Sequence, residues 1–420
     1  MARCHQHSRT IRELPANVKD RILECLPTRD AARTALLSKH WHNVWLGHGR
    51  LVFDSDFFQF LGKSEDDDKS ISFVNIIHNV LLLRTGRVKK FTLEINKAQD
   101  HMPQQSDLDL WCSFLSRNGV EELNISFFGL DEHLYKLPDC IVSCQTIKQL
   151  KLQGFLIDLP VNIGCIFAGV TSLALENLNF KPSVYGIGSS VISIPNLEKL
   201  AFRFCYGIES FEISAPKLET FYAISIKHAE LAVVEYRCFR LHLKGIKTLC
   251  LSGVLLLCKD VAGALYMYPI AINLQVMKLH DLSFGCGKQL TVAMQLLQKF
   301  PNLCELDIIA KQSSSTDDKH AASRLLNDPD RCFINKDLRM LKTVKIVSFS
   351  GSELEILFVK MLLSKSPSLE NVVIQETEKI KSSMKTLRKL LSFPRASPKA
   401  QLVCMKYKSS ANSLVDYLNF

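Results

Sequence analysis

The chain has 420 residues, of which 47% are hydrophobic and 22% charged, so it has ample apolar material for more than one folded domain. Its formal net charge of +10 is local, because the segment 379–408 holds nine Lys or Arg and no Asp or Glu; removing those nine from the 52 basic residues leaves 43 against 42 acidic. A nearly neutral body does not favour nucleic acid or a membrane surface as the main partner.

The fourteen cysteines are scattered among apolar neighbours, as at Cys25, Cys112, Cys205 and Cys250, and show no disulfide framework. We therefore expect them to act as small core residues in a reducing compartment. The first ten residues are too polar for a signal peptide, and the longest uncharged run, 261–277, is short and contains a proline and two amides. These features predict a soluble intracellular protein, in the cytoplasm or the nucleus, without a transmembrane helix.

The first predicted elements are three short helices within residues 14–54. Pro15 suits a first helical turn, where its missing N–H has no partner to lose. Val18, Ile22 and Leu26 recur every four residues and predict one apolar helix face, and Pro27 ends the helix.

Asp30 is a plausible N-cap for the second helix, which extends through Leu37, and Trp41 and Trp45 lie four residues apart on the third. About forty residues bury this much apolar surface poorly. Two interpretations follow: a helical cap over the rest of the chain, or a docking module whose partner completes its core.

Beyond Phe53 the sequence repeats. An apolar residue, two others, an apolar residue, one other and an apolar residue recur at intervals of mostly 21 to 32 residues, close to the leucine-rich-repeat period of about 20–29. One six-residue copy carries no information, but ten or eleven in near register predict a solenoid. The copies begin at Val88, Val120, Ile147, Val170, Leu197, Ile246, Leu274, Leu303, Leu341 and Leu369, with a weaker one at Leu218.

Alternation along a strand places the last two apolar residues of each copy in a continuous core and the residues between them on the concave face of a parallel sheet. We expect this exposed ladder to bind a target protein, with Lys151, Lys199, Arg203, Tyr222 and Lys278 as anchors, because Arg and Tyr are enriched among interface hot spots. Its predicted members are Gln149, Lys151, Ser172, Ala174, Lys199, Ala201, Arg203, Tyr222, Cys250, Lys278 and Lys345.

The pattern changes near the C-terminus. Ser352 and Glu355 have capping-box spacing ahead of an apolar helix, and a second helix carrying Leu387 and Leu391 precedes a last strand. We expect the basic residues of this segment to form its solvated face. The result is a helix-flanked unit that closes the repeat array.

No motif predicts catalysis, a metal site or a cofactor. Cys4, His5 and His7 lack a second ligand pair at zinc spacing, so we assign no metal site. The sequence FGCGKQL resembles a phosphate loop only superficially, because Gln289 stands where Ser or Thr would hold magnesium. We expect a protein that is not an enzyme.

The segment LPANVKDRILECLPTRDAARTALLSKHWHNVW closely resembles an F-box. The matching residues are Leu14-Pro15, Ile22-Leu23, Leu26-Pro27, Arg29-Asp30, Leu37-Ser38, Trp41 and Trp45. The histidines on both sides of Trp41 depart from the basic residues usual there. LKTVKIVSFSGSELEILFVKMLLSKSPSLENVVI resembles an FBD domain, and LLSFPRASPKAQLVCMKY is similar to its usual ending. With the repeats between them, the whole chain resembles the plant-type F-box/FBD/leucine-rich-repeat family.

The resemblance implies an α/β fold. A three-helix F-box at 10–54 would precede a leucine-rich-repeat solenoid with a curved parallel sheet at 70–335, closed by an FBD domain at 336–410. It also implies a substrate receptor of a cullin-RING ubiquitin ligase, whose F-box docks on a Skp-type adaptor and through it on a cullin. Transfer chemistry then belongs to the conjugating enzyme. Carried over by motif, the adaptor-binding residues are Leu14, Pro15, Ile22, Leu26 and Pro27, with Trp41 and Trp45 either touching the adaptor or locking the helices together.

Two alternatives stay open: a leucine-rich-repeat interaction scaffold without a ligase role, and nucleic-acid binding by the basic C-terminal segment, which the local charge favours less. Neither the target protein nor any small-molecule co-ligand follows from the sequence.

Overall fold

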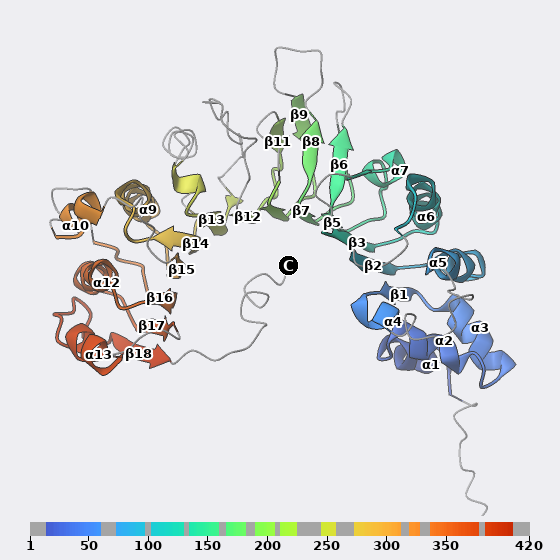
Figure 1. The fold of residues 1–420 in the computed structure, drawn as a ribbon, viewed down its shortest axis with the longest axis horizontal. Coiled ribbons are helices and arrows are strands. Elements are labelled where there is room, and N and C mark those ends of the chain that lie inside the picture. Colours follow the sequence, from blue (N-terminus) through green and yellow to red (C-terminus); the bar gives the residue numbers. More distant parts are fainter. Residues whose placement is uncertain are drawn as a thin grey trace, which may run out of the picture. The chain divides into compact units, whose positions relative to one another are not determined.

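A computed structural model describes most of the chain (Figure 1). The described residues are 14–59, 73–96, 102–129, 134–158, 165–181, 190–205, 211–224, 245–257, 273–311, 319–327, 337–377 and 383–405. Cys4, His5 and His7, most of the uncharged run 261–277 and part of the basic segment 379–408 lie outside them.

Contacts divide the chain into two units, which we call the first unit (1–159 and 165–181) and the second unit (160–164 and 182–420). In each unit the main strands are parallel and follow one another in chain order. The first unit contains β1 (Arg50–Phe53), β2 (Lys90–Asn96), β3 (Glu122–Phe128), β5 (Gln149–Gln153) and β7 (Ser172–Glu176). The second contains β10 (Lys199–Arg203), β12 (Thr220–Ile224), β13 (Thr248–Ser252), β14 (Val276–Ser283), β15 (Glu305–Lys311), β16 (Thr343–Phe349), β17 (Asn371–Glu376) and β18 (Gln401–Met405).

The predicted repeats are confirmed as strands. Each of the eleven copies begins two residues before a strand of these ladders, from Val88 before β2 to Leu369 before β17. The first apolar residue of every copy is buried, with Leu303 the most exposed at 3%. This leading residue turns into the core before the strand begins, so the copies share one structural register.

Helices cover one side of the strands within each unit, as Figure 1 shows, and we call the opposite strand surface the open face. The first unit has α5 (Phe73–Leu82), α6 (Gln105–Arg117) and α7 (Asp139–Val142) on the helix side. The second has α9 (Gly287–Lys299), α10 (Lys319–Asn327), α12 (Glu353–Lys365) and α13 (Ser383–Leu391). The core lies between strands and helices. Shorter elements are α4 (Ser55–Gln59), η4 (Leu255–Leu257) and two small parallel sheets, β4 (Tyr135–Lys136) with β6 (Phe155–Asp158) and β8 (Asn179–Lys181), and β9 (Ser190–Ser193) with β11 (Phe211–Ser214).

The three N-terminal helices are confirmed as α1 (Ala16–Glu24), α2 (Thr28–Thr34) and α3 (Lys39–Gly47). Asp30 is not the N-cap of α2: the helix begins at Thr28 after Pro27, and Asp30 lies in its first turn, 3.4 Å from the Arg33 guanidinium. The side-chain cap is on α3 instead, where the Ser38 hydroxyl accepts the Trp41 N–H at 3.2 Å.

Details of the C-terminal helices and of several cysteines differ from expectation. The capping box of α12 is confirmed, with the Glu355 carboxylate accepting the Ser352 N–H at 2.8 Å. On α13 the buried leucine is Leu390, whereas Leu391 is 49% exposed.

The expected burial of cysteines holds only in part. It is confirmed for Cys112, Cys144, Cys205 and Cys250, and four other described cysteines are half-buried. It is wrong for Cys25 and Cys165, which are exposed; Cys25 follows the last turn of α1 at the surface.

Among the helices of the described ranges, none combines the length and the apolar composition needed to cross a membrane.

Candidate functional site

Helix α1 presents apolar side chains to solvent. Its buried residues are Lys19 (1% exposed) and Leu23 (0%), whereas Val18 and Ile22 are each 37% exposed. The apolar periodicity therefore predicted the helix but marked a face that the chain does not cover. Lys19 is buried because its ammonium lies 5.9 Å from the centroid of the Trp41 ring, a cation–π arrangement.

Two more large apolar side chains are exposed at the junction between α2 and α3. Leu36 is 88% exposed and Leu37 is 65% exposed. With Val18 and Ile22 they make up what we call the exposed apolar set of the N-terminal helices. Burying an apolar side chain contributes roughly 25 cal/mol of free energy for each Å² of its surface removed from water. Several exposed apolar side chains in one short segment are typical of protein-contact surfaces.

The other predicted adaptor residues lie near this set in the chain. Pro15 and Pro27 are exposed, each as the residue preceding the first turn of a helix, and Leu14 and Leu26 are half-buried. The Pro15 carbonyl accepts the Val18 N–H at 3.1 Å, so this proline fixes the start of α1.

Trp41 and Trp45 are only 4% and 7% exposed, so little of either side chain is accessible to a partner. The motif left two roles open for them, and their burial supports locking the helices together. Contact of either tryptophan with the adaptor stays a prediction.

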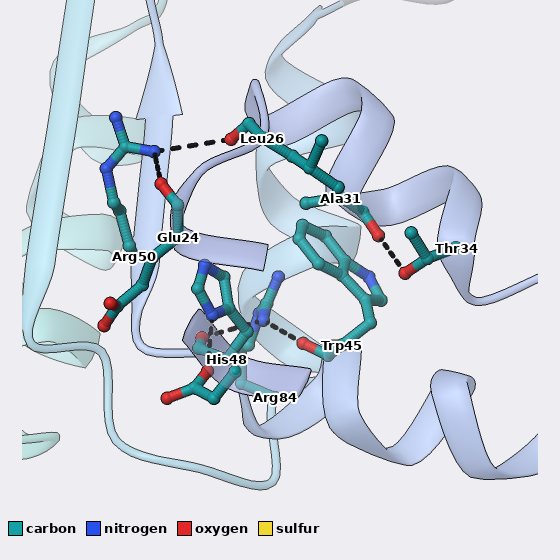
Figure 2. A network of polar contacts seen from close by, with 9 residues as sticks. Glu24, Leu26, Ala31, Thr34, Trp45, His48, Arg50 and Arg84 are labelled. Carbon is teal, nitrogen blue, oxygen red and sulfur yellow. Dashed lines mark hydrogen bonds and ion pairs between the residues drawn. The ribbon is translucent and has the colours of Figure 1, made fainter. Parts of the chain in front are cut away.

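A polar network joins the helices to the first repeat (Figure 2). Arg84, two residues beyond α5, donates hydrogen bonds through Nη1 to the carbonyls of Trp45 and His48, and its guanidinium carbon lies 4.1 Å from the Trp45 ring centroid. Burial lowers the pKa of Arg84 to about 10, which leaves it a cation at neutral pH. His48, 2% exposed, places its Nδ1 2.7 Å from the Asp20 carboxylate on α1.

Strand β1 completes this junction. Arg50 donates through Nη1 to the carbonyls of Glu24 at 3.0 Å and Leu26 at 3.4 Å (Figure 2). Strand β1 pairs in register with β2, with Arg50 opposite Lys90. The helices and the repeats thus share one strand. Sequence reasoning missed β1 and Arg84, since neither carries a motif.

On the open face of the first unit, charged side chains pair with neighbours and stay accessible. The ammonium of Lys90 lies 2.6 Å from the Glu122 carboxylate, and Asn124 donates to Glu94 at 3.1 Å. Lys151, one of the predicted target anchors, is exposed on β5.

The open face of the second unit carries charged side chains that are largely buried. Lys199 is exposed and Arg203 and Tyr222 are half-buried, but Lys278 and Asp307 form an ion pair, 3.8 Å apart, whose side chains are only 20% and 11% exposed. Burial is the main cause that raises the pKa of Asp307.

Cys250 was expected on the exposed ladder and is fully buried, which corrects that prediction. Its register neighbours, Tyr222 on β12 and Lys278 on β14, have much longer side chains, and a thiol between them is covered. Burial raises the pKa of Cys250 to about 12, so the thiol is protonated at neutral pH. It therefore shapes the surface rather than acting as a nucleophile.

Comparison with known protein families matches both regions. The model of the F-box domain matches residues 11–53, and the model described as At1g61320/AtMIF1, LRR domain, matches residues 83–319, more than half of the chain.

Relatives named after the same domains occur in Arabidopsis thaliana. The F-box/FBD/LRR-repeat protein At1g13570 is 29% identical over 433 residues, covering 94% of this chain and 98% of that protein. The F-box/LRR-repeat protein At2g42730 is 22% identical, covering 93% and 97%. The FBD-associated F-box protein At3g52670 is 24% identical over a shorter region, 58% of this chain and 54% of that protein. Since the F-box and leucine-rich-repeat models both match and a relative covered over nearly its whole length is named an F-box/FBD/LRR-repeat protein, this chain belongs to the plant-type F-box/FBD/leucine-rich-repeat family.

Proposed function

We propose that the chain is the substrate-recognition subunit of a cullin-RING ubiquitin ligase of the Skp–cullin–F-box type. The F-box implies binding of a Skp-type adaptor, and the leucine-rich repeats imply protein interaction. Proteins of this architecture are generally non-catalytic adaptors. In this assignment the N-terminal helices dock on the adaptor, the open face of the repeats binds the target protein, and the protein acts in the cytoplasm or the nucleus.

The observation that carries the proposal is the exposed apolar set Val18, Ile22, Leu36 and Leu37. Burying one such side chain contributes roughly 1.5–3 kcal/mol. Several together are comparable to an association penalty of about 4–15 kcal/mol. The polar junction through Arg84 and His48 supports the same role, because it attaches the N-terminal helices to the first repeat.

We assign the described elements from β16 to β18 to the FBD unit at 336–410. The support is the capped helix α12 and the pairing of β17 with β18, which add a helix-covered end to the second unit. Its assignment as a separate domain is part of the proposal.

The test measures the affinity of the full-length chain for a Skp-type adaptor. The double variant Leu36→Ser/Leu37→Ser should weaken binding about tenfold or more, since two exposed side chains lose their apolar contact. The matched control is Leu82→Ser/Leu83→Ser, a second pair of adjacent leucines, 71% and 63% exposed in the same unit, which should bind as the wild type does. Leu14→Ala/Pro15→Ala, at the entry to α1, should abolish binding while the repeats stay folded.

If Leu36→Ser/Leu37→Ser and Leu14→Ala/Pro15→Ala both bind the adaptor with wild-type affinity, the contact face is elsewhere. If the wild-type chain binds no Skp-type adaptor, the interaction scaffold without a ligase role becomes the better assignment.

A further inference from the structure

Five side chains form one row across the open face of the second unit. In the parallel register, Tyr222 lies opposite Cys250, Cys250 opposite Lys278, Lys278 opposite Asp307 and Asp307 opposite Lys345. Neighbouring strands are about 4.8 Å apart, so the row spans four steps of that size from β12 to β16. The cations of Lys278 and Lys345 therefore stand on both sides of Asp307.

Part of the row is buried. Cys250 is 0% and Asp307 is 8% exposed, and on the next row toward the strand ends Ser252 is 0% and His280 is 6% exposed. In the first unit, the position corresponding to Cys250 is more open, with Lys151 on β5 exposed and Ala174 on β7 half-buried, whereas Ser126 and Gln153 on the next row are buried as well. A ligand at the buried charged groups would meet interactions that water screens weakly.

The charge of this face is positive on balance. Among the described open-face residues of the strands concerned, β10 provides Lys199 and Arg203, β14 provides Lys278, and β16 provides Lys345. The opposing carboxylates are Glu305 and Asp307, both on β15. Asp281 lies at the bulge that ends this register of β14 and is exposed at the rim.

Electrostatic effects on His280 agree with this balance. Burial is the main cause that lowers the pKa of His280; Asp281 raises it, and Lys278 and Arg203 lower it further. The imidazole is thus held neutral next to two cations from different strands, in a place that disfavours additional positive charge.

We propose that the open face of β10 and β12–β16 binds an acidic segment of the target protein, with Arg203, Lys278 and Lys345 receiving its Asp or Glu side chains. The proposal rests on the proposed function in taking the ligand to be the target. Lys278 is the central residue, because Asp307 already holds its ammonium in place. Arg203 offers a planar guanidinium that can hold a carboxylate in two parallel hydrogen bonds.

The arrangement fits carboxylates of a protein better than a nucleic acid. Base stacking requires exposed aromatic rings, whereas on these rows of the described strands the rings are the half-buried Tyr222 and the buried His280. A continuous phosphate backbone would also meet Glu305 and Asp307. An acidic peptide can place its few carboxylates at the cations and leave uncharged residues next to β15.

The experiment uses the full-length chain, alone and mixed with a Skp-type adaptor, and two fluorescent peptides, one of alternating Glu and Ala and its counterpart of alternating Gln and Ala. Fluorescence anisotropy should show binding of the Glu peptide that weakens as salt rises. Lys278→Gln should weaken it about tenfold, the usual scale for a hydrogen bond to a charged group. Asp307→Asn should strengthen it about threefold, since it removes a like charge without changing shape.

The matched control for Lys278→Gln is Lys288→Gln. Lys288 is exposed on α9, on the helix side of the same unit, so the variant loses the same charge away from the row that contains Lys278. A second pair, Lys345→Gln against Lys342→Gln, repeats the comparison on β16 in case the first variant unfolds, which circular dichroism detects; Lys342 is exposed just before the strand.

Opposite effects of Lys278→Gln and Asp307→Asn support the proposal, because loss of a merely structural ion pair would weaken binding in both. Equal binding of the Gln peptide, or an equal loss in Lys288→Gln, overturns it. So does tighter binding of a poly-dT oligonucleotide or of a phosphoserine peptide through Lys278, which would identify a phosphate site. Adaptor affinity measured on the same samples separates this result from the proposed function, since acidic-peptide binding without adaptor binding refutes only the ligase role.

Discussion

The N-terminal helices and the repeat strands differ in how far their apolar residues are buried. In the strands, the apolar positions of each copy are buried, as Leu123 at 2% and Leu306 at 0% exposure illustrate. In α1 the order is reversed, with Lys19 buried at 1% while Val18 and Ile22 are each 37% exposed. The repeats complete their own core, whereas the helices keep apolar surface available for a partner.

The helices can do this because polar groups hold them in place. Arg84 joins the end of α3 to the first repeat through the carbonyls of Trp45 and His48, and the His48 imidazole joins the end of α3 to the Asp20 carboxylate on α1. Buried aromatic and cationic groups stabilise this junction. The apolar surface of α1 and the side chains of Leu36 and Leu37 are therefore not needed to hold the helices in place. Three substitutions test that division.

The largest effect is expected for Trp45→Ala. Trp45 is 7% exposed and lies under the Arg84 guanidinium, so the variant loses both the buried ring and the cation–π contact. Truncating a buried Trp costs about 3–5 kcal/mol. Chemical denaturation should show this loss, and the control Leu36→Ala, at an 88% exposed position, should change stability little. If Trp45→Ala instead left stability intact and abolished adaptor binding, Trp45 would be a contact residue after all.

A smaller loss is expected for Gly86→Ala at the same junction. An added Cβ would lie 2.5 Å from the Gly47 carbonyl oxygen and 2.8 Å from the Gly47 Cα. Both are backbone atoms that cannot rotate away, so the end of α3 must shift from the first repeat. Overpacking of this kind costs about 1–3 kcal/mol.

Gly47→Ala is the matched control for Gly86→Ala, because nothing lies within 4 Å of a Cβ at that position. The Gly86 variant should show a lower unfolding midpoint than the Gly47 variant. Equal midpoints would mean that the helices and the repeats are joined loosely, contrary to the geometry of the Arg84 network.

The repeat strands were predictable because their signal is both local and repeated. Alternation of apolar and polar residues predicts which side of a strand faces the core. A single copy of the pattern can arise by chance, but eleven copies at a regular interval cannot be explained in that way. Which side of α1 is buried within the chain was not predictable in the same way. Periodicity identifies an apolar helix face, but whether the chain or a partner covers it depends on Trp41 and Trp45, which lie on another helix.

The candidate sites were predictable only in part, for a related reason. The open-face positions of Lys278 and Tyr222 follow from alternation, but the burial of Cys250 depends on the size of its register neighbours. Asp307 went unnoticed because a single carboxylate in an apolar strand has no motif. Arg84 depends on a contact between residues far apart in sequence. Such effects come from pairing across elements, which a one-dimensional pattern does not contain.

The smallest effect is expected for Asp20→Asn. The Asp20 carboxylate lies 2.7 Å from the Nδ1 of His48, but its side chain is 47% exposed, so water screens the charge. Asparagine keeps an oxygen that can accept the same hydrogen bond. The loss of unfolding free energy should therefore stay below about 1 kcal/mol and shrink further as salt is added. Asp30→Asn is the control, since Asp30 is 51% exposed and pairs with Arg33 on its own helix. A loss of several kcal/mol in Asp20→Asn alone would show that the Asp20–His48 pair, which joins α1 to the end of α3, stabilises the helices more than the tryptophans and Arg84 do. The polar contact would then be the main anchor of the helices, and the buried ring of Trp45 would be secondary.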